Sequence, residues 1–299
     1  MEKSTENAGF GDCQNASEVQ EKLIFDIGFH VGNDTAYYLS RGYRVVAVEA
    51  NPSLADEGRR RFNAEIASGH LTILNVAMSP TSGAIIPFYI NDIYSAKSSL
   101  DPARAQKWEK YHRVEVEGVT IGELFKTWGV PWYLKMDIEG ADEMVVRTLP
   151  QGGPVPKYFS CELGHGRPIA GLLSSHGYTG FKLINGGTLT QSVDIYDSEL
   201  FMRALRKVGG LCPPVHSLIA GLPDGIRPKK TLWDPPRTRL PHLLTISQTT
   251  GPFAEETDGP WLSIAEMNRR LDYLFGQCAR DGVEDTFWYD LHARHASAG

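Results

Sequence analysis

The sequence is short of the features that define several protein classes. Its four cysteines lie far apart and form no CxxC pair, which argues against a disulfide framework and against a structural zinc site. No apolar run approaches the roughly 18 residues of a membrane-spanning helix, and segment 1–20 has no apolar core typical of a signal peptide. We therefore expect a cytoplasmic protein without membrane contact, whose residues 1–20 form a flexible tail.

The chain also lacks an excess of positive charge. Its 299 residues carry a formal net charge of -6, so it has no electrostatic footprint of a general nucleic-acid binder. Hydrophobic residues make up 41% and charged residues 22%, which is ordinary for a globular protein with a sizeable core. This length suits one large domain or a domain with an elaborated cap.

Short apolar runs alternate with helical segments up to residue 185. The predicted strands lie at 23–25, 44–48, 71–76, 84–90, 114–119, 132–136, 157–161 and 178–184. The predicted helices lie at 34–41, 51–66, 120–128, 141–149 and 169–176. This alternation predicts an α/β fold of the Rossmann-like kind, with a mostly parallel sheet covered by helices on both faces.

The regular pattern fades after this core, which we assign to residues 21–185. Residues 186–240 are rich in Gly and Pro and are too long for a simple connection, so we predict an irregular insertion or lid there. Residues 241–299 are expected to pack on the core through a final strand at 242–247 and an amphipathic helix at 264–278.

Three polar residues follow that helix, Asp290, His292 and His295. They are a candidate metal-binding group, but we interpret them as a polar tail, and we predict no metal ligand in this chain.

The segment from Asp26 to Thr35 joins the first strand to the first helix and contains Gly28 and Gly32. Glycine lets the backbone approach a ligand without a Cβ in the way, and ligands of open α/β sheets bind outside the carboxyl ends of the strands. Glu49 ends the next strand, 21 residues after Gly28, where an acid accepts hydrogen bonds from ribose hydroxyls. The combination predicts a nucleoside site.

The loop also indicates which nucleoside derivative binds. A dinucleotide site usually shows GxGxxG, whereas this loop has GxxxG and is preceded by Asp26. A carboxylate repels a pyrophosphate and attracts the ammonium and sulfonium groups of S-adenosylmethionine. The sequence therefore favours S-adenosylmethionine. A nicotinamide-dependent oxidoreductase, or a catalytically inactive nucleoside-binding protein of the same fold, is the alternative.

A second group of residues ends the later strands. Asp137 is expected to face the same crevice as Gly28, where it would hold the amino group of the cofactor, or orient or deprotonate a substrate hydroxyl. Glu139 lies near a helix N-terminus, where interaction with the helix dipole is the alternative role. Glu162 faces the crevice as well. His165 has an ordinary pKa of about 6.5, which suits a general base, although a solvent-exposed loop histidine would look the same.

Further candidates lie in the loop, at the end of the third strand and in the irregular segment after the fourth. His30 is placed to contact cofactor or substrate, or simply to pack. An adenine edge is expected at the third strand end, and two serines are expected to fold over the cofactor. These residues are Asn75, Val76, Ala77, Ser98 and Ser99.

Taken together, these motifs resemble the FkbM family of methyltransferases. The matching segments are Phe25–Gly28 with Gly32 and Thr35, Val48–Pro52, Asn75–Ala77, Ser98–Ser99, Leu134–Asp142, Ser160–Glu162, Gly177–Tyr178, Phe181–Leu183 and Gly251–Glu255. The resemblance covers about residues 22–185 and scattered later pieces. It implies a class I methyltransferase fold with a seven-stranded sheet and, usually, O-methylation of a hydroxyl on a sugar or natural product.

Carried over by position, the resemblance makes Asp26, Gly28, Gly32 and Glu49 cofactor contacts and Asp137 and Glu162 pocket residues. Together with the candidates argued from the residues, they form the predicted site. The cofactor contacts are Asp26, Gly28, His30, Gly32, Thr35, Glu49, Ala50, Asn51, Asn75, Val76, Ala77, Ser98, Ser99 and Asp137. The substrate contacts are Glu139, Glu162, His165 and Lys182. The chain departs from the family at Phe29-His30, where a small residue and Asn are common, and at the insertion 186–240. Both departures leave the acceptor open.

The implied reaction requires the protein mainly to align the reactants and to exclude water from the site. An alcohol must still lose a proton, and the candidate bases are Asp137, His165 and His30, in that order. Asp137 and Glu162 would also suit Mg²⁺ in a metal-assisted variant. The expected partner is a small-molecule methyl acceptor, glycosylated or not.

Overall fold

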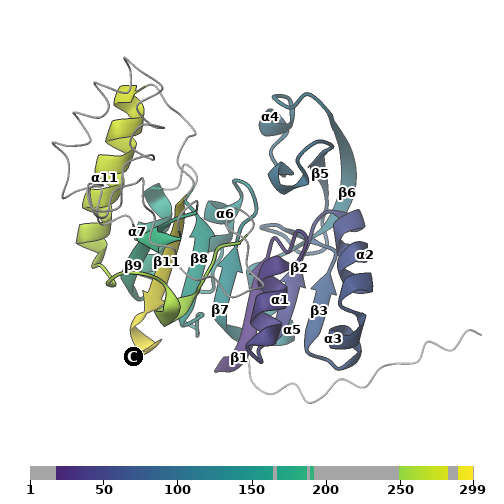
Figure 1. The fold of residues 1–299 in the computed structure, drawn as a ribbon, viewed down its shortest axis with the longest axis horizontal. Helices are drawn as coiled ribbons and strands as arrows, with labels where there is room; N and C mark the ends of the chain where they lie inside the picture. Colours follow the sequence, from purple (N-terminus) through teal and green to yellow (C-terminus); the bar gives the residue numbers. More distant parts are fainter. Residues whose placement is uncertain (1–17, 164–166, 187–188, 192–248, 282–288, 299) are drawn as a thin grey trace, which may run out of the picture.

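A computed structural model describes residues 18–163, 167–186, 189–191, 249–281 and 289–298, and its fold is shown in Figure 1. The first elements along the chain are β1 (Val19–Ile27), α1 (Asn33–Ser40), β2 (Arg44–Val48), α2 (Pro52–Arg61), α3 (Asn63–Ala67), β3 (Leu71–Leu74) and β4 (Ala77–Met78). Next come β5 (Ile85–Asn91), η1 (Ser95–Lys97), α4 (Pro102–Ala105), β6 (Tyr111–Val119), α5 (Ile121–Trp128), β7 (Val130–Met136) and α6 (Asp142–Arg147). The last are β8 (Tyr158–Glu162), α7 (Arg167–Ser175), β9 (Tyr178–Asn185), β10 (Thr190–Gln191), η2 (Ala254–Glu256), α11 (Ile264–Asp281), β11 (Tyr289–His295) and η3 (Ala296–Ala298).

The main sheet has the strand order β10-β9-β11-β8-β7-β1-β2-β3. Strands β3, β2, β1, β7 and β8 pair in parallel, and β11 lies antiparallel between β8 and β9. This order, with one antiparallel strand inserted near the edge, is that of the class I methyltransferase fold. The predicted seven-stranded, mostly parallel sheet is confirmed, and the two-residue strand β10 extends it at one edge.

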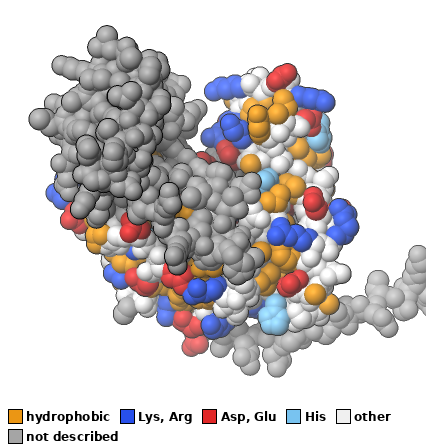
Figure 2. Space-filling model, viewed as in Figure 1, with side chains coloured by type: hydrophobic (Ala, Val, Ile, Leu, Met, Phe, Trp, Pro, Cys, Tyr) orange, Lys and Arg blue, Asp and Glu red, His pale blue; other side chains and the backbone are white. Residues whose placement is uncertain are grey.

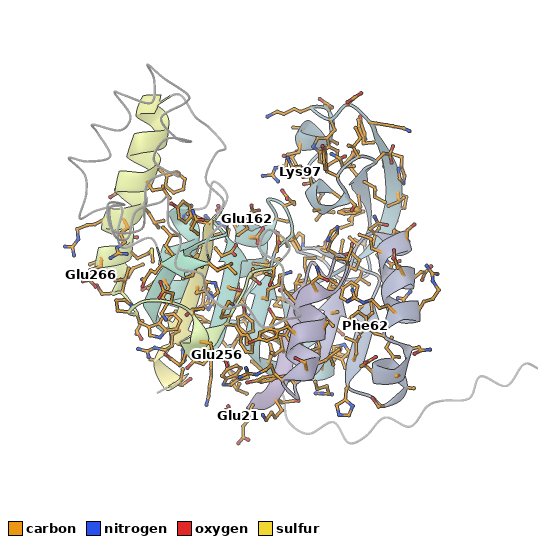
Figure 3. All side chains as sticks on the ribbon, viewed as in Figure 1. Glu21, Phe62, Lys97, Glu162, Glu256 and Glu266 are labelled. Carbon is orange, nitrogen blue, oxygen red and sulfur yellow. The ribbon has the colours of Figure 1, made fainter. Side chains whose placement is uncertain are left out.

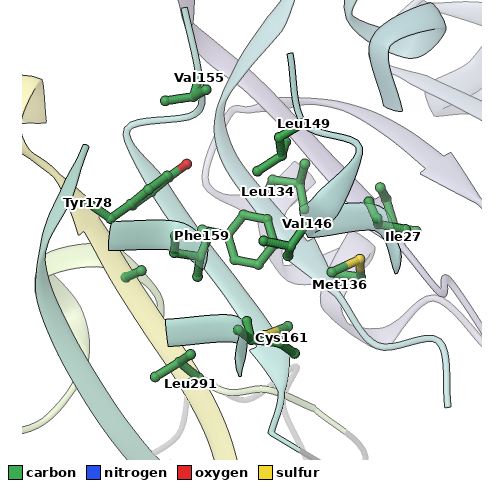
Figure 4. Close-up of a cluster of buried hydrophobic side chains, with 14 of the residues drawn as sticks. Ile27, Leu134, Met136, Val146, Leu149, Val155, Phe159, Cys161, Tyr178 and Leu291 are labelled. Atoms are coloured by element: carbon green, nitrogen blue, oxygen red, sulfur yellow. The ribbon is translucent and has the colours of Figure 1, made fainter. Parts of the chain in front are cut away.

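Helices cover both faces of the sheet because its strands alternate apolar side chains between two cores. On one face, strand residues such as Leu134 and Phe159 pack against α5, α6, α7 and α11. Figure 4 shows part of this core, with Leu134 and Phe159 near Val146 of α6. On the other face, Val45 and Tyr133 pack against α1, α2 and the segment around Phe253. The apolar stripe predicted for the last helix lies in the first core, where α11 inserts Met267 and Leu271.

A smaller sheet, with order β4-β6-β5, stands beyond the carboxyl ends of the main strands. Residues 85–119, which comprise β5, η1, α4 and β6, are called the cap below. Figure 2 shows Lys and Arg side chains around its outer end. The cap has its own small core that includes Phe88, Ile90 and Val116.

Several predicted boundaries are confirmed by local chemistry. Strand β2 has its predicted limits, and Asn51 caps α2 by accepting a hydrogen bond from the Ser53 amide at 3.0 Å. Thr120 likewise caps α5. Strand β1 starts at Val19, inside the segment that was predicted as tail.

The prediction of a single helix over 51–66 is wrong, because this segment forms two helices, α2 and α3, which are separated at Phe62. The Phe62 ring is buried and meets the edge of Phe29 at a centroid distance of 6.0 Å. Gly32 permits this packing, since it adopts φ +77° and a Cβ on it would lie 2.5 Å from the Phe29 ring. Burial of Phe62 therefore outweighs helix continuation, and its backbone leaves the helical region at φ -107°, ψ 31°.

The interpretation of Asp290, His292 and His295 as a polar tail is wrong. These residues belong to β11, which pairs with β8 on one side and β9 on the other. The predicted strand 242–247 and most of the predicted insertion 186–240 lie outside the described residues. Among the helices that the structure describes, none has the length and apolarity needed to cross a bilayer.

The packing of Phe253 generates a stability prediction. Its ring stacks on Tyr133 at 5.0 Å and 15° and meets the edge of Tyr38 at 5.1 Å. Phe253→Ala should lower the free energy of unfolding by about 3–5 kcal/mol, because it removes a buried ring and leaves a cavity. Urea denaturation measures the change. Ile85→Ala, at a side chain that is 64% exposed, serves as the control and should change stability by at most about 0.5 kcal/mol.

Candidate functional site

A cavity of about 660 Å³ lies between the carboxyl ends of the parallel strands and the cap. The core contributes Gly28, Glu49, Asp137 and Glu162 from the ends of β1, β2, β7 and β8, and the cap contributes residues around Lys97. Figure 3 labels Lys97 and Glu162, which belong to the two sides of this cavity. The position at the strand ends is where open α/β sheets bind ligands.

Gly28 is the point where three strand ends converge. Its amide donates to the Val48 carbonyl at 3.0 Å, and a Cβ on it would lie only 1.9 Å from the Asp137 carbonyl oxygen. Its φ of +88° is also one that other residues rarely adopt. Glycine is therefore required here both for backbone conformation and for the close approach of β1 to β7.

Glu49 is held rigidly in the cavity wall. Its Oε2 accepts the His30 amide and its Oε1 accepts the Asn51 amide, both at 2.7 Å. Burial raises the pKa of Glu49 to about 7, although these two amides oppose the shift. The carboxylate oxygens keep further lone pairs, so the group is prepared to accept hydrogen bonds from a ligand in the cavity.

Lys135 holds the glycine loop from below. Its Nζ donates to the Gly28 carbonyl at 2.8 Å, forms an ion pair with Asp26 Oδ1 at 3.1 Å and lies 3.9 Å from Asp34 Oδ2. The residue is only 3% exposed. Burial disfavours its charged form, but Asp26, Asp137 and Asp34 outweigh burial and raise the pKa of Lys135.

This arrangement corrects the electrostatic argument about Asp26. The Asp26 side chain is fully buried, pairs with Lys135 and accepts a hydrogen bond from Thr35 Oγ1 at 2.6 Å. It does not line the cavity. Its charge is therefore balanced within the protein, and Asp26 supports the loop instead of facing a cationic ligand.

The opposite end of the cavity is acidic. Asp137, Glu139 and Glu162 line it, and Asp142 lies buried close by. Burial and the nearby Asp137 raise the pKa of Glu162 to about 8 and that of Asp142 to about 7. In the part of the chain that the structure describes, no three His, Cys, Asp or Glu side chains are placed to hold a metal ion together.

Three contacts join the cap to the core over the cavity. His30 and Ser95 share a hydrogen bond of 3.0 Å between Nε2 and Oγ. Ser99 donates to the Glu139 carbonyl at 2.9 Å, and Arg104 donates to Glu139 Oε2 at 2.6 Å. Burial lowers the pKa of His30, with a further contribution from the Lys135 charge, so its imidazole is neutral near pH 7. The cap and the glycine loop thus close one wall together.

Most predicted cofactor residues meet at the cavity. Those that line it are Gly28, His30, Glu49, Ala50, Val76, Ala77, Ser98 and Asp137. Those that lie behind the lining are Asp26, Gly32, Thr35, Asn51, Asn75 and Ser99. The second group acts through hydrogen bonds and packing: Asn75 Nδ2, for example, donates to the Glu49 carbonyl at 2.8 Å and holds the end of β2.

The predicted substrate residues divide in the same way. Glu139 and Glu162 line the cavity, whereas His165 lies outside the described residues. Lys182 does not line the cavity, which corrects that prediction. Its Nζ donates to the carbonyl and hydroxyl oxygens of Thr257 at 2.8 and 2.9 Å and lies 4.3 Å from the centre of the Trp261 ring.

Sequence reasoning missed several lining residues. Lys135 carried a usable signal, because a lysine inside an apolar strand requires buried acids as partners. Asp34 and Thr249 also line the cavity and are hydrogen-bonded to each other through their side chains. Their contact spans distant parts of the chain and has no local signature. The same holds for Ser95 and Lys97 of the cap.

Residues 26–158 match the family model described as methyltransferase FkbM domain. The resemblance to the FkbM family noted in the sequence is confirmed over this segment. No curated protein matches the chain.

Solved structures that this chain resembles include methyltransferases. Precorrin-6y C5,15-methyltransferase from Geobacter metallireducens GS-15 has 14% identity over 56% of this chain and 69% of that chain, with a TM-score of 0.31. The METTL16 MTase domain has 13% identity over 57% of this chain and 55% of that chain, with a TM-score of 0.34. Cofactor-bound Rv0187 from MTB has 14% identity over 58% and 70%, with a TM-score of 0.30.

The buried acids predict how stability depends on pH. The raised pKa values of Glu162, Asp142 and Glu49, about 8, 7 and 7, mean that the folded protein binds more protons than the unfolded chain below about pH 8. Stability should therefore fall as pH rises through these values. The lowered pKa values of His30 and His292 act in the opposite direction, but only below about pH 6.5. Without ligand, the free energy of unfolding should decrease between about pH 6.5 and 8.5.

A matched pair of variants tests whether Glu162 contributes to this decrease in the free energy of unfolding. Glu162→Gln removes one of the titrating groups and should flatten the decrease, as measured by urea denaturation at several pH values. Glu57→Gln makes the same change at an exposed position on α2 and should leave the pH dependence unaltered. A free energy of unfolding that rises over this pH range would contradict the raised pKa values of Glu162, Asp142 and Glu49.

Proposed function

We propose that this methyltransferase uses S-adenosylmethionine to methylate a hydroxyl group of a small molecule, a sugar or another natural product. The observation that carries the proposal is the Glu49 carboxylate, fixed by two backbone amides at 2.7 Å beside the glycine loop. A fixed carboxylate at the end of the second strand is suited to the two hydroxyls of a ribose.

The cavity fits such a cofactor in its residue types. Gly28 lines the cavity without a side chain, so the backbone of the loop can lie against a ligand there. Glu49 would hold the ribose, and Val76 and Ala77 would contact the adenine edge. When bound, S-adenosylmethionine supplies a methyl group on a positively charged sulfur.

The protein's own residues then have to position and deprotonate the acceptor. Asp137 is the first candidate for the base, since it lines the cavity and its side chain has no hydrogen-bond partner in the described part of the chain. The neutral His30 is engaged with Ser95 at 3.0 Å, which makes it a weaker candidate. A positioned base contributes about 10²–10⁴-fold, and alignment in a closed site contributes about 7–11 kcal/mol.

The oxidoreductase alternative is not supported. The matched family is one of methyltransferases, and Asp34 lies in the first turn of α1, where a dinucleotide would place its pyrophosphate. The alternative of an inactive protein of the same fold is tested by turnover. Incubation with methyl-labelled S-adenosylmethionine and a pool of hydroxyl compounds should release S-adenosylhomocysteine.

Cofactor binding tests the proposal directly. Isothermal titration with S-adenosylhomocysteine should show saturable binding, and Glu49→Ala should weaken it by about 10–100-fold because hydrogen bonds to a charged acceptor are lost. Glu57→Ala, on the exposed face of α2, should bind as the wild type does. Absence of binding to the wild-type protein would refute the proposed function, and unchanged affinity of Glu49→Ala would refute the ribose role.

A further inference from the structure

The acidic end of the cavity has fewer cations than carboxylates. Arg104 pairs with Glu139, and Lys97 also faces Glu139 from the cap. The Lys135 ammonium group forms an ion pair with Asp26 and donates a hydrogen bond to the Gly28 carbonyl. Within the residues that the structure describes, these are the cations directed at this end.

Glu162 and Asp137 form no ion pair with a described cation, although the charge of Lys135 acts on Asp137 and that of Arg104 acts on Glu162. Neither side chain forms a hydrogen bond or an ion pair with any described residue, although both line the cavity. They stand at the ends of the neighbouring strands β8 and β7. Two unpaired carboxyl groups therefore face the space beside the expected cofactor position.

A buried carboxyl group lies beside Glu162. Asp290 of β11 is the antiparallel register partner of Glu162, so both side chains project from the same face of the sheet with Cβ atoms roughly 4.5–5.5 Å apart. Asp290 is only 1% exposed, and its Oδ2 has no hydrogen-bond partner. A buried, unpaired carboxyl oxygen is rare and costly. Asp290 does not itself line the cavity but lies directly beside Glu162, which does, so a positive ligand that reaches Glu162 would also offset the cost at Asp290.

We propose that this wall, formed by Asp137 and Glu162 with Asp290 beside Glu162, binds a protonated amine of the methyl acceptor. The inference rests on the proposed function and narrows it: the acceptor is a hydroxyl compound that also carries an amine, such as an amino sugar or an amino alcohol. A protonated amine has no lone pair with which to attack a methyl group, so it serves for recognition and the neighbouring hydroxyl is methylated.

Glu162 and Asp137 have different roles in this proposal. Glu162 binds the ammonium group, and Asp137 accepts the hydroxyl proton as the acceptor oxygen bonds to the methyl carbon. The electron pair of the broken carbon–sulfur bond remains on sulfur, so charge and atoms balance. The raised pKa of Glu162, about 8, agrees with a carboxyl group that lacks its cation in the free protein.

The experiment uses the full chain saturated with S-adenosylhomocysteine and pairs of probes that differ only in charge. Glucosamine, galactosamine and ethanolamine are each titrated calorimetrically beside their N-acetylated counterparts at a pH where the amine is protonated. We expect at least one amine to bind about tenfold or more tightly than its neutral counterpart. Glu162→Gln should remove most of this preference, and Glu57→Gln should keep it.

Asp290→Asn provides a second variant, with thermal unfolding as a check that both site variants are folded, and it should also reduce the preference. Equal affinity within every probe pair, or an amine preference that survives in folded Glu162→Gln, would overturn the proposal. So would saturable Mg²⁺ binding that depends on Glu162 without any amine preference. If S-adenosylhomocysteine itself does not bind, the proposed function fails; if it binds and no amine is preferred, only the acceptor class fails.

Discussion

The ammonium group of Lys135 is buried beneath the glycine loop, and the geometry of the site depends on it. Without Lys135, Asp26 would be a buried charge without a partner, which is strongly destabilising. With it, the same nitrogen also holds the Gly28 carbonyl at 2.8 Å. One ion pair therefore sets the position of the loop, and the loop amide of His30 in turn orients Glu49.

The two ends of the cavity differ in whether the protein supplies partners for their acidic side chains. At the loop end, each buried acid has a partner in the protein: Lys135 for Asp26, threonines for Asp34 and backbone amides for Glu49. At the far end, the side chains of Glu162 and Asp137 lack such partners. These unpaired carboxyl groups at the far end are the basis of the amine site proposed above.

The elements were predicted more reliably than the partners of their residues. The sequence predicted that the negative charge of Asp26 attracts a cationic ligand, but in the structure the Asp26 carboxylate forms an ion pair with Lys135. The strand β11 was missed because Asp290 and His292 suggested a polar tail, although Tyr289 and Leu291 alternate with them as in a strand. Its polar side chains are buried because β8 and β9 enclose β11 on both sides, which no local pattern shows.

The sequence by itself determined the first strand, the two-glycine loop, the second strand and the acid at its end, because these follow one another along the chain and have local signatures. It thereby determined the fold class and the strand ends at which the cavity lies. Only the tertiary structure decided which side chains share that site. The pairing of Asp290 with Glu162 and the closure of the cavity by Ser95 depend on strand order and on the position of the cap. Both arise from contacts between distant segments, and such contacts are set by packing of the whole fold.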